Sequence, residues 1–571
     1  MDSEDLSPIG TAEWSAERAR HLLERAGFGG TPAEVARLAA MTPAEAVADL
    51  IDYRRYSDAA LPPFDPSGLW DDSLKEFPVS RPAATEAGER NGAAMGVRVK
   101  PGGARPLQPI ANRFFFWLRA TVLETRRIAF WWADRMVRTR RPLEEKMTLF
   151  WHGHFATSEE KLRDYRKIFL QLETLRTGAT GNFGELLVAV AKDPAMLVFL
   201  DAAQNVKGAP NENFGREVME LFTMGVGNYT EDDIREAARA FTGWGNDDLH
   251  FVFDREKHDA GPKHFLGRTG NFGGEDILAI ILEQKQTAIY IASKLYRFFV
   301  REEVSQGLAE RLGDLLRSHS YEIAPFLTAV FLSRGFYSAA SIGTHIKSPI
   351  ELIVSTSRKL GLAELPSIPD PNAVGRTLGQ VLLYPPTVAG WSGGRAWMTP
   401  GLLFERGNYA REVMFPNVID FVDPNYFPGE EIRRVNKNIL SGMEITAATL
   451  EDGATLSATA GIQETFNTRY ASLVGYSEAL RKLKPIPRRA AQFSLSALIE
   501  EAGATTTTAA VDHLLARLLV VPISADVRTA LIELLDGELG TNDIAIASTY
   551  MEHGLRMVAH LIMSSPQYQL A

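Results

Sequence analysis

The sequence predicts a mainly α-helical, multi-helix globular fold with at most a short β-hairpin near residues 250–266. Apolar residues recur at helical spacing in most segments, whereas the alternation typical of half-buried strands is almost confined to His250–Asp254. Two identical helix starts, Thr31–Glu34 and Thr42–Glu45, each offer a Thr cap, a Pro at the first helical position and a Glu at the third. We therefore expect two short, closely spaced helices there.

The chain divides into four regions by composition. Pro, Gly and Ala are frequent after residue 60, which is typical of a long surface loop between helical segments. Helical spacing then resumes. We expect N-terminal helices over 1–60, a Pro/Gly-rich loop insertion over 61–110, a helical core carrying the candidate site over 111–415, and a C-terminal helical region over 416–571.

The composition excludes several classes of site and partner. The 571 residues include no cysteine, so disulfides and thiolate chemistry are excluded, and any metal would need His, Asp or Glu ligands. The net charge of −10 argues against nucleic-acid binding. The chain carries no P-loop, dinucleotide fingerprint or catalytic-serine elbow, so no nucleotide cofactor is expected.

Neither a membrane span nor a signal peptide is expected. No stretch approaches about 18 consecutive apolar residues. The acidic N-terminal stretch lacks the apolar segment of a signal peptide. The prediction is a cytoplasmic protein as given, or an exported one if a leader has been removed, and the sequence leaves the oligomeric state open.

Two histidines stand two residues apart in the aromatic stretch MTLFWHGHFATS (Met147–Ser158). In an extended segment, His152 and His154 would point to the same side and could chelate a divalent metal. On a helix the same spacing separates them by about 200°, and chelation fails. The other interpretation is that each imidazole is a buried polar group bonded to the backbone.

A helix predicted over Asn211–Phe222 supplies carboxylates for the same site. Glu217 lies at the edge of its apolar face, whereas Glu212, Arg216 and Glu220 lie on the other side. Arg216 is four residues from both Glu212 and Glu220, a spacing that favours surface ion pairs. Glu217 is therefore the carboxylate expected to bind a metal or transfer a proton.

A Gly/Pro-rich loop, HDAGPKHFLG, follows the predicted hairpin strand. Polar side chains on rigid loops often serve a site, and a His beside an Asp suits a general base or a metal ligand. The alternative is a solvent-exposed loop. The residues concerned are His258, Asp259 and Lys263.

The segment YPPTVAGWSGGRAW (Tyr384–Trp397) places two tryptophans near an arginine. Trp391, Arg395 and Trp397 could form a flat platform for a sugar ring or a cation. They could equally fill a gap between packed regions.

The run TRRIAFWWADRMVRTRRP (Thr125–Pro142) contains six arginines interleaved with aromatic residues, as in some nucleic-acid sites. In an acidic chain, we expect these arginines to pair with local carboxylates or to line a cleft for an anionic substrate.

Seven motifs together resemble one family. In chain order they are HLLERAGFG, RPLEEKMTLFWHGHFATS, NENFGREVMELFTMGVGNYTEDD, AARAFTGW, HDAGPKHFLG, IKSPIEL and PPTVAGWSGGRAW. The chain is similar over about residues 15–570 to the bacterial proteins grouped as domain of unknown function 1800. The resemblance draws attention to the motif residues without giving them a role, namely His152, His154, Asn211, Glu212, Arg216, Glu217, Glu220, His258, Asp259 and Lys263.

The expected function is that of an enzyme, a hydrolase or lyase acting on a polar small molecule such as a saccharide. In one version, a divalent metal held by His152, His154 and Glu217 activates water. In the other, Glu217 and Glu220 or His258 serve as acid/base groups without metal. The candidate catalytic residues are Arg216, Glu217, Glu220, His258, Asp259 and Lys263. In both, the substrate contacts are Asn211, Glu212, Trp391, Arg395 and Trp397. The alternative class is a non-catalytic helical binding or scaffold protein with structural His and Glu networks.

Overall fold

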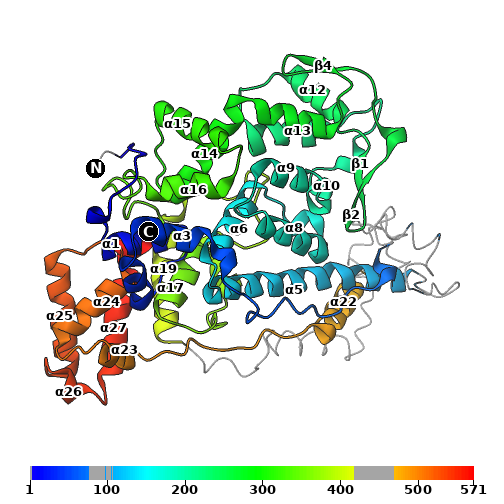
Figure 1. Cartoon of the computed structure of the whole chain (residues 1–571). Helices are drawn as coiled ribbons and strands as arrows, with labels where there is room; N and C mark the ends of the chain where they lie inside the picture. The colour runs from blue at the N-terminus through cyan, green and yellow to red at the C-terminus, as the bar shows by residue number, and fades with distance from the viewer. Residues whose placement is uncertain are drawn as a thin grey trace.

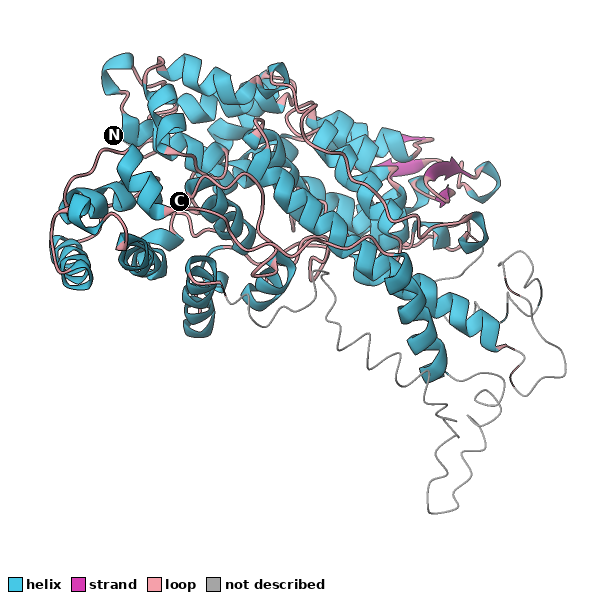
Figure 2. Cartoon of the chain, turned by 90° about the horizontal axis from the view of Figure 1, so that it is seen from below, coloured by secondary structure: helices cyan, strands magenta, loops and turns pink. Residues whose placement is uncertain are grey.

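The computed structural model describes residues 3–75, 107–416 and 468–571, together with positions 86, 90, 97 and 105. Most of the predicted loop insertion and the first part of the predicted C-terminal region therefore lie outside the described residues. Within the described part, the fold is mainly α-helical, as predicted, and Figures 1 and 2 show helix throughout with strands gathered at one edge. None of the described helices is both long and apolar enough to span a bilayer.

The N-terminal and central helices precede residue 400. They are α1 (Ala16–Ala26), α2 (Pro32–Ala39), α3 (Pro43–Ile51), α5 (Gln108–Arg138), α6 (Pro142–His154), α7 (Glu159–Leu162), α8 (Tyr165–Thr177), α9 (Phe183–Ala191), α10 (Pro194–Phe199), α11 (Glu212–Glu217), α12 (Glu231–Ala240), α13 (Gly274–Glu283), α14 (Lys285–Phe299), α15 (Gln306–Ser318), α16 (Ile323–Leu332), α17 (Pro349–Lys359) and α18 (Pro371–Leu378).

The C-terminal helices and the short turns complete the helical set. The helices are α19 (Pro400–Met414), α22 (Thr468–Lys482), α23 (Leu495–Glu501), α24 (Thr507–Leu518), α25 (Ala525–Leu539), α26 (Ile544–Ala547) and α27 (Met551–Ser564). A π-helical turn, η5 (Val218–Thr223), follows α11 directly. The 3-10 turns are η1 (Thr11–Glu13), η2 (Tyr53–Arg55), η3 (Asp72–Leu74), η4 (Ala202–Gln204), η6 (Arg255–Lys257), η7 (Gly394–Trp397) and η8 (Pro566–Gln569).

Two antiparallel hairpins hold the described strands. The first pairs β1 (Trp244–Asp247) with β2 (His250–Phe253), and the second pairs β3 (Lys263–Phe265) with β4 (Arg268–Gly270). The range 250–266, where one hairpin is predicted, contains β2 of the first hairpin and β3 of the second. These two strands pair with β1 and β4, and not with each other.

Both predicted helix starts near the N-terminus are confirmed. The Thr31 and Thr42 hydroxyls each accept a hydrogen bond from the backbone N–H three residues on, and Glu34 and Glu45 reciprocate. Such capping boxes satisfy backbone donors that the first helical turn leaves free. The starts of helices α2 and α3 are therefore fixed by residues within their own first turns.

Helix α6 lies between two hydrophobic cores. Leu149 belongs to the core built around α5, α17 and the C-terminal helices, whereas Met147 and Trp151 belong to the core of α1–α3 and α9–α16. All of its residues except Gly153 are buried, as expected for a helix covered on every side. Its C-terminal turn, the WHGH stretch, consequently lies in the interior between the two cores.

Candidate active-site cavity

A cavity of about 540 Å³ forms beside the last turn of α6. Helix α14, the 344–351 segment and the 389–397 loop provide most of the rest of its wall, to which Glu302 and Gln380 also contribute. It brings together four of the predicted site residues, His154, Trp391, Arg395 and Trp397. A concave site of this size with aromatic and polar walls is the usual form of a small-molecule site.

A lysine amine and an imidazole form the central polar pair of the cavity. Lys294 Nζ donates to His154 Nδ1 at 3.1 Å and to the Tyr290 hydroxyl at 3.3 Å. His154 Nε2 lies 3.0 Å from the Phe222 carbonyl, which must accept, so the imidazole carries its proton on Nε2 and accepts on Nδ1. Among the described residues Lys294 has no carboxylate partner.

Burial shifts the pKa values of both groups. It lowers the pKa of His154 well below 6.5, and the Lys294 charge adds to the effect. It also lowers the pKa of Lys294 to about 8, with Arg297 contributing repulsion. Near neutral pH, His154 is therefore neutral, and a usable fraction of Lys294 is the free amine.

The opposite wall rests on buried ion pairs. Glu351 accepts from Ser348 N at 2.7 Å and from His345 Nε2 at 3.1 Å, and it pairs with Lys146 of α6. Behind it, Glu24 of α1 pairs with Lys347 at 3.2 Å and with Lys359 at 2.9 Å. These pairs join α1, α6 and α17 and fix the cavity wall.

His152 lies on a different side of α6 from His154. The helix continues through His154, so the helical alternative holds and the two side chains diverge. His152 Nε2 accepts from the Leu383 backbone N–H at 3.1 Å, and its ring packs edge-on against Trp132 and Trp391. It anchors the segment that leads into the cavity loop.

The His152→Gln variant is expected to make unfolding less sensitive to acid. Burial lowers the pKa of His152 from 6.5 to about 3, so between those values the unfolded chain binds one more proton than the folded chain. The free energy of unfolding then falls with falling pH by about 1.4 kcal/mol per unit from this group. Urea titrations from pH 6 to pH 4 should show that slope reduced in the variant.

The exposed His250 gives the matched control for this measurement. His250→Gln should leave the slope unchanged. If both substitutions left it unchanged, His152 would not be a neutral buried group.

Gly153, between the two histidines, meets the cavity loop backbone to backbone. A Cβ placed on Gly390, which has φ +82°, would lie 2.3 Å from the Gly153 carbonyl oxygen. A Cβ on Gly153 itself would meet no atom within 4 Å. The contact therefore requires glycine at position 390, whereas position 153 has room for a larger side chain.

Gly390→Ala is expected to destabilise the protein and Gly153→Ala to stabilise it. The first forces a clash and a left-handed conformation, which alone costs about 1–2 kcal/mol. The second improves helix propensity by up to about 1 kcal/mol. Thermal unfolding of the two variants checks the opposite signs, and equal shifts would contradict the described contact.

The helix that carries Glu217 lies outside the cavity lining. Arg216 pairs with Glu212, as predicted, and with Glu231, whereas Glu220 accepts from the Tyr229 hydroxyl at 2.8 Å instead of pairing with Arg216. Burial and the Glu220 charge raise the pKa of Glu217. Asn211 caps the helix by accepting from the backbone of the second residue after it.

The 258–263 loop is held by its own contacts. His258 Nδ1 lies 2.9 Å from the Thr242 carbonyl, Asp259 pairs with Arg239 at 2.8 Å, and Lys263 Nζ donates to the Asp259 and Gly261 carbonyls. None of the loop's residues lines the cavity. In the part of the chain that the structure describes, no group of three or more His, Asp or Glu side chains is placed to hold a metal ion.

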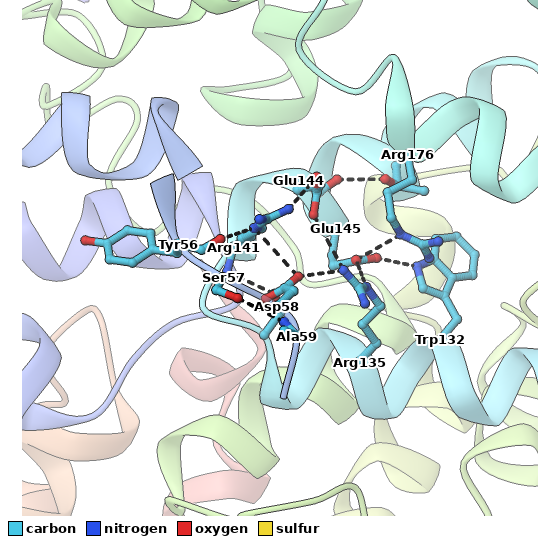
Figure 3. Close-up of polar contacts among 12 residues, drawn as sticks. Tyr56, Ser57, Asp58, Ala59, Trp132, Arg135, Arg141, Glu144, Glu145 and Arg176 are labelled. Atoms are coloured by element: carbon cyan, nitrogen blue, oxygen red, sulfur yellow. Dashed lines mark hydrogen bonds and ion pairs between the residues drawn. The ribbon is translucent and has the colours of Figure 1, made fainter. Parts of the chain in front are cut away.

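The arginine run pairs mainly with local carboxylates, as predicted. Figure 3 shows its central part, where Arg135 and Arg176 flank the buried Glu145, to which Trp132 Nε1 donates at 2.8 Å. The remaining partners are Asp370 for Arg126, Glu124 for Arg127, Asp134 for Arg138, Asp58 and Glu144 for Arg141, and the Tyr56 ring for Arg140.

Lys294 is among the cavity residues that the sequence does not predict, together with Arg297, His345 and Glu351. A signal for it exists, because Tyr290 and Phe298 flank it at four residues on either side and place an amine on an aromatic helix face. The partner imidazole lies 140 residues away, and no spacing rule links the two.

Comparisons with known proteins support the resemblance of the seven motifs. The family model described as "Protein of unknown function (DUF1800)" matches residues 21–570. Neither the comparison with curated proteins nor that with solved structures gave a match.

Proposed function

Because the chain belongs to the DUF1800 family, whose description names no activity, we propose a function from the cavity: acid/base catalysis by a hydrolase or lyase on a polar small molecule such as a saccharide. The observation that carries it is the Lys294 amine, which lines the cavity, donates to a neutral imidazole and lacks a carboxylate partner among the described residues.

Lys294 is the proposed proton acceptor. In its neutral form, one N–H can donate to His154 Nδ1 while the lone pair faces a substrate proton or a water molecule. His154 holds the amine in place, because its own proton is committed to the Phe222 carbonyl. Trp391, Trp397 and Arg395 offer surfaces for the substrate.

The proposal keeps acid/base chemistry without metal but assigns the proton transfer to Lys294. The residues predicted for that role do not line the cavity, namely Arg216, Glu217, Glu220, His258, Asp259 and Lys263. In the metal version, His152, His154 and Glu217 would have to converge, whereas the two imidazoles diverge from one helix and Glu217 does not line the cavity. A non-catalytic binding protein is the second candidate. It is favoured by the full engagement of Glu351 with Lys146, Ser348 and His345, which leaves that carboxylate unavailable as a second proton-transfer group.

Turnover of a panel of 4-nitrophenyl glycosides, uronides and esters tests the proposal. Lys294→Met should lower kcat/KM by about 10²–10⁴-fold, and the wild-type value should rise with pH through about 8 as the amine loses its proton. The control is Lys285→Met on the same helix, which removes an exposed lysine near Asp314. Turnover that survives in Lys294→Met would overturn the proposal, and ligand binding without turnover would favour the second candidate.

A further inference from the structure

The cavity wall carries more positive than negative charge. Lys294, Arg297 and Arg395 line it, against Glu302 and Glu351. Glu351 is already neutralised by buried Lys146 and bonded to His345 and Ser348. The charge of Glu302 therefore faces three cations.

Arg297 and Arg395 differ from most arginines of this protein. The arginines of the 125–142 run lie against protein partners, mostly carboxylates. By contrast, Arg297 and Arg395 are exposed and have no protein partner among the described residues. In a chain of net charge −10, two unpaired guanidinium groups at one cavity mark a local site for negative charge.

The two arginines come from separate elements. Arg297 follows Lys294 by three residues on α14, and Arg395 lies in η7 of the cavity loop. Arg297 and the Lys294 amine are close enough to repel, since the Arg297 charge contributes to lowering the pKa of Lys294. An anion bound among them would relieve this repulsion.

Aromatic side chains indicate the rest of the ligand. Trp391 and Trp397 line the cavity from the loop, and Phe298 and Tyr290 line it from α14. Flat apolar faces suit the C–H face of a sugar ring, and a cavity of about 540 Å³ is in the size range of small-molecule sites.

We infer that this cavity binds an acidic saccharide through its oxyanion group, a carboxylate or a phosphate, which Arg297 and Arg395 hold while the ring lies against the tryptophans. The inference rests on the proposed function only in taking this cavity as the substrate site. It names the substrate class, which the proposed chemistry leaves open.

Binding of three sugars that differ only at C6 tests the inference. Glucuronate, glucose 6-phosphate and glucose would each be titrated into the full chain by calorimetry, with thermal shift as a second readout. At least one anionic sugar should bind and raise Tm, and glucose should bind about tenfold more weakly or worse. The preferred anion tells carboxylate from phosphate.

Arg297→Gln and Arg395→Gln should each raise the Kd of the anionic sugar by about tenfold to a hundredfold. Arg411→Gln, an exposed arginine outside the cavity lining, should leave Kd unchanged. Because all three side chains are exposed, the ligand-free variants should keep the wild-type Tm. Absence of binding by both anions, equal binding of glucose, or equal effects of Arg411→Gln would overturn the inference. Anion binding without turnover would overturn the proposed function alone.

Discussion

Glu351→Ala is expected to lower the free energy of unfolding by about 3–5 kcal/mol. The carboxylate is buried and caps α17 through Ser348 N, accepts from His345, and pairs with Lys146, whose side chain is 1% exposed. Its removal leaves a buried ammonium without its counter-charge and removes a helix cap. Urea-induced unfolding measures the loss.

Glu364→Ala is the matched control, because that carboxylate forms an exposed pair with Arg489. It should cost no more than about 1 kcal/mol. The double variant Lys146→Met/Glu351→Ala should recover part of the loss, since both charges are then absent. Equal costs for the two single Glu variants would show that Glu351 is not a buried partner.

Glu145→Ala is expected to cost about 3 kcal/mol or more. Glu145 is fully buried and accepts from Arg176 Nε at 3.0 Å and from Trp132 Nε1 at 2.8 Å, besides pairing with Arg135 (Figure 3). It therefore links α5, α6 and α8 through one carboxylate. Without Glu145, the largely buried guanidinium groups of Arg135 and Arg176 lose the acceptor that they share.

Glu173→Ala provides a control on the same arginine. Glu173 also pairs with Arg176, but its side chain is 42% exposed, so its loss should cost below about 1 kcal/mol. Chemical denaturation of both variants gives the comparison. A Glu145→Ala cost as small as that of Glu173→Ala would mean that burial does not govern this network.

The parts of the fold predicted correctly rest on local chemistry. The Thr31 and Thr42 helix starts need only residues three positions away, and both capping boxes form. The pairing of the arginine run also follows largely from nearby acids, such as Asp134 for Arg138. For such features, the sequence contains both partners within a few residues.

The site depends on contacts that no local pattern contains. Helix α6 runs through His154, and the partners of its two imidazoles are distant in the sequence, since His152 accepts from the Leu383 N–H and His154 lies beside the Phe222 carbonyl. The Lys294–His154 pair likewise needs the fold to bring two helices together. Spacing alone therefore leaves open whether His152, His154 and Glu217 meet at one site.

The Glu24 ion pairs have a consequence for the order of assembly. Glu24 and Lys359 are 335 positions apart along the chain, and Lys347 lies beside the residues that form the cavity wall. Contacts between residues so far apart in the sequence form late in folding, because the entropy cost of closing a large loop comes before the contact can stabilise the chain. Ligand binding should therefore return among the last steps of refolding, after most of the helical circular-dichroism signal. Its return would report the docking of α1 rather than the formation of any single helix.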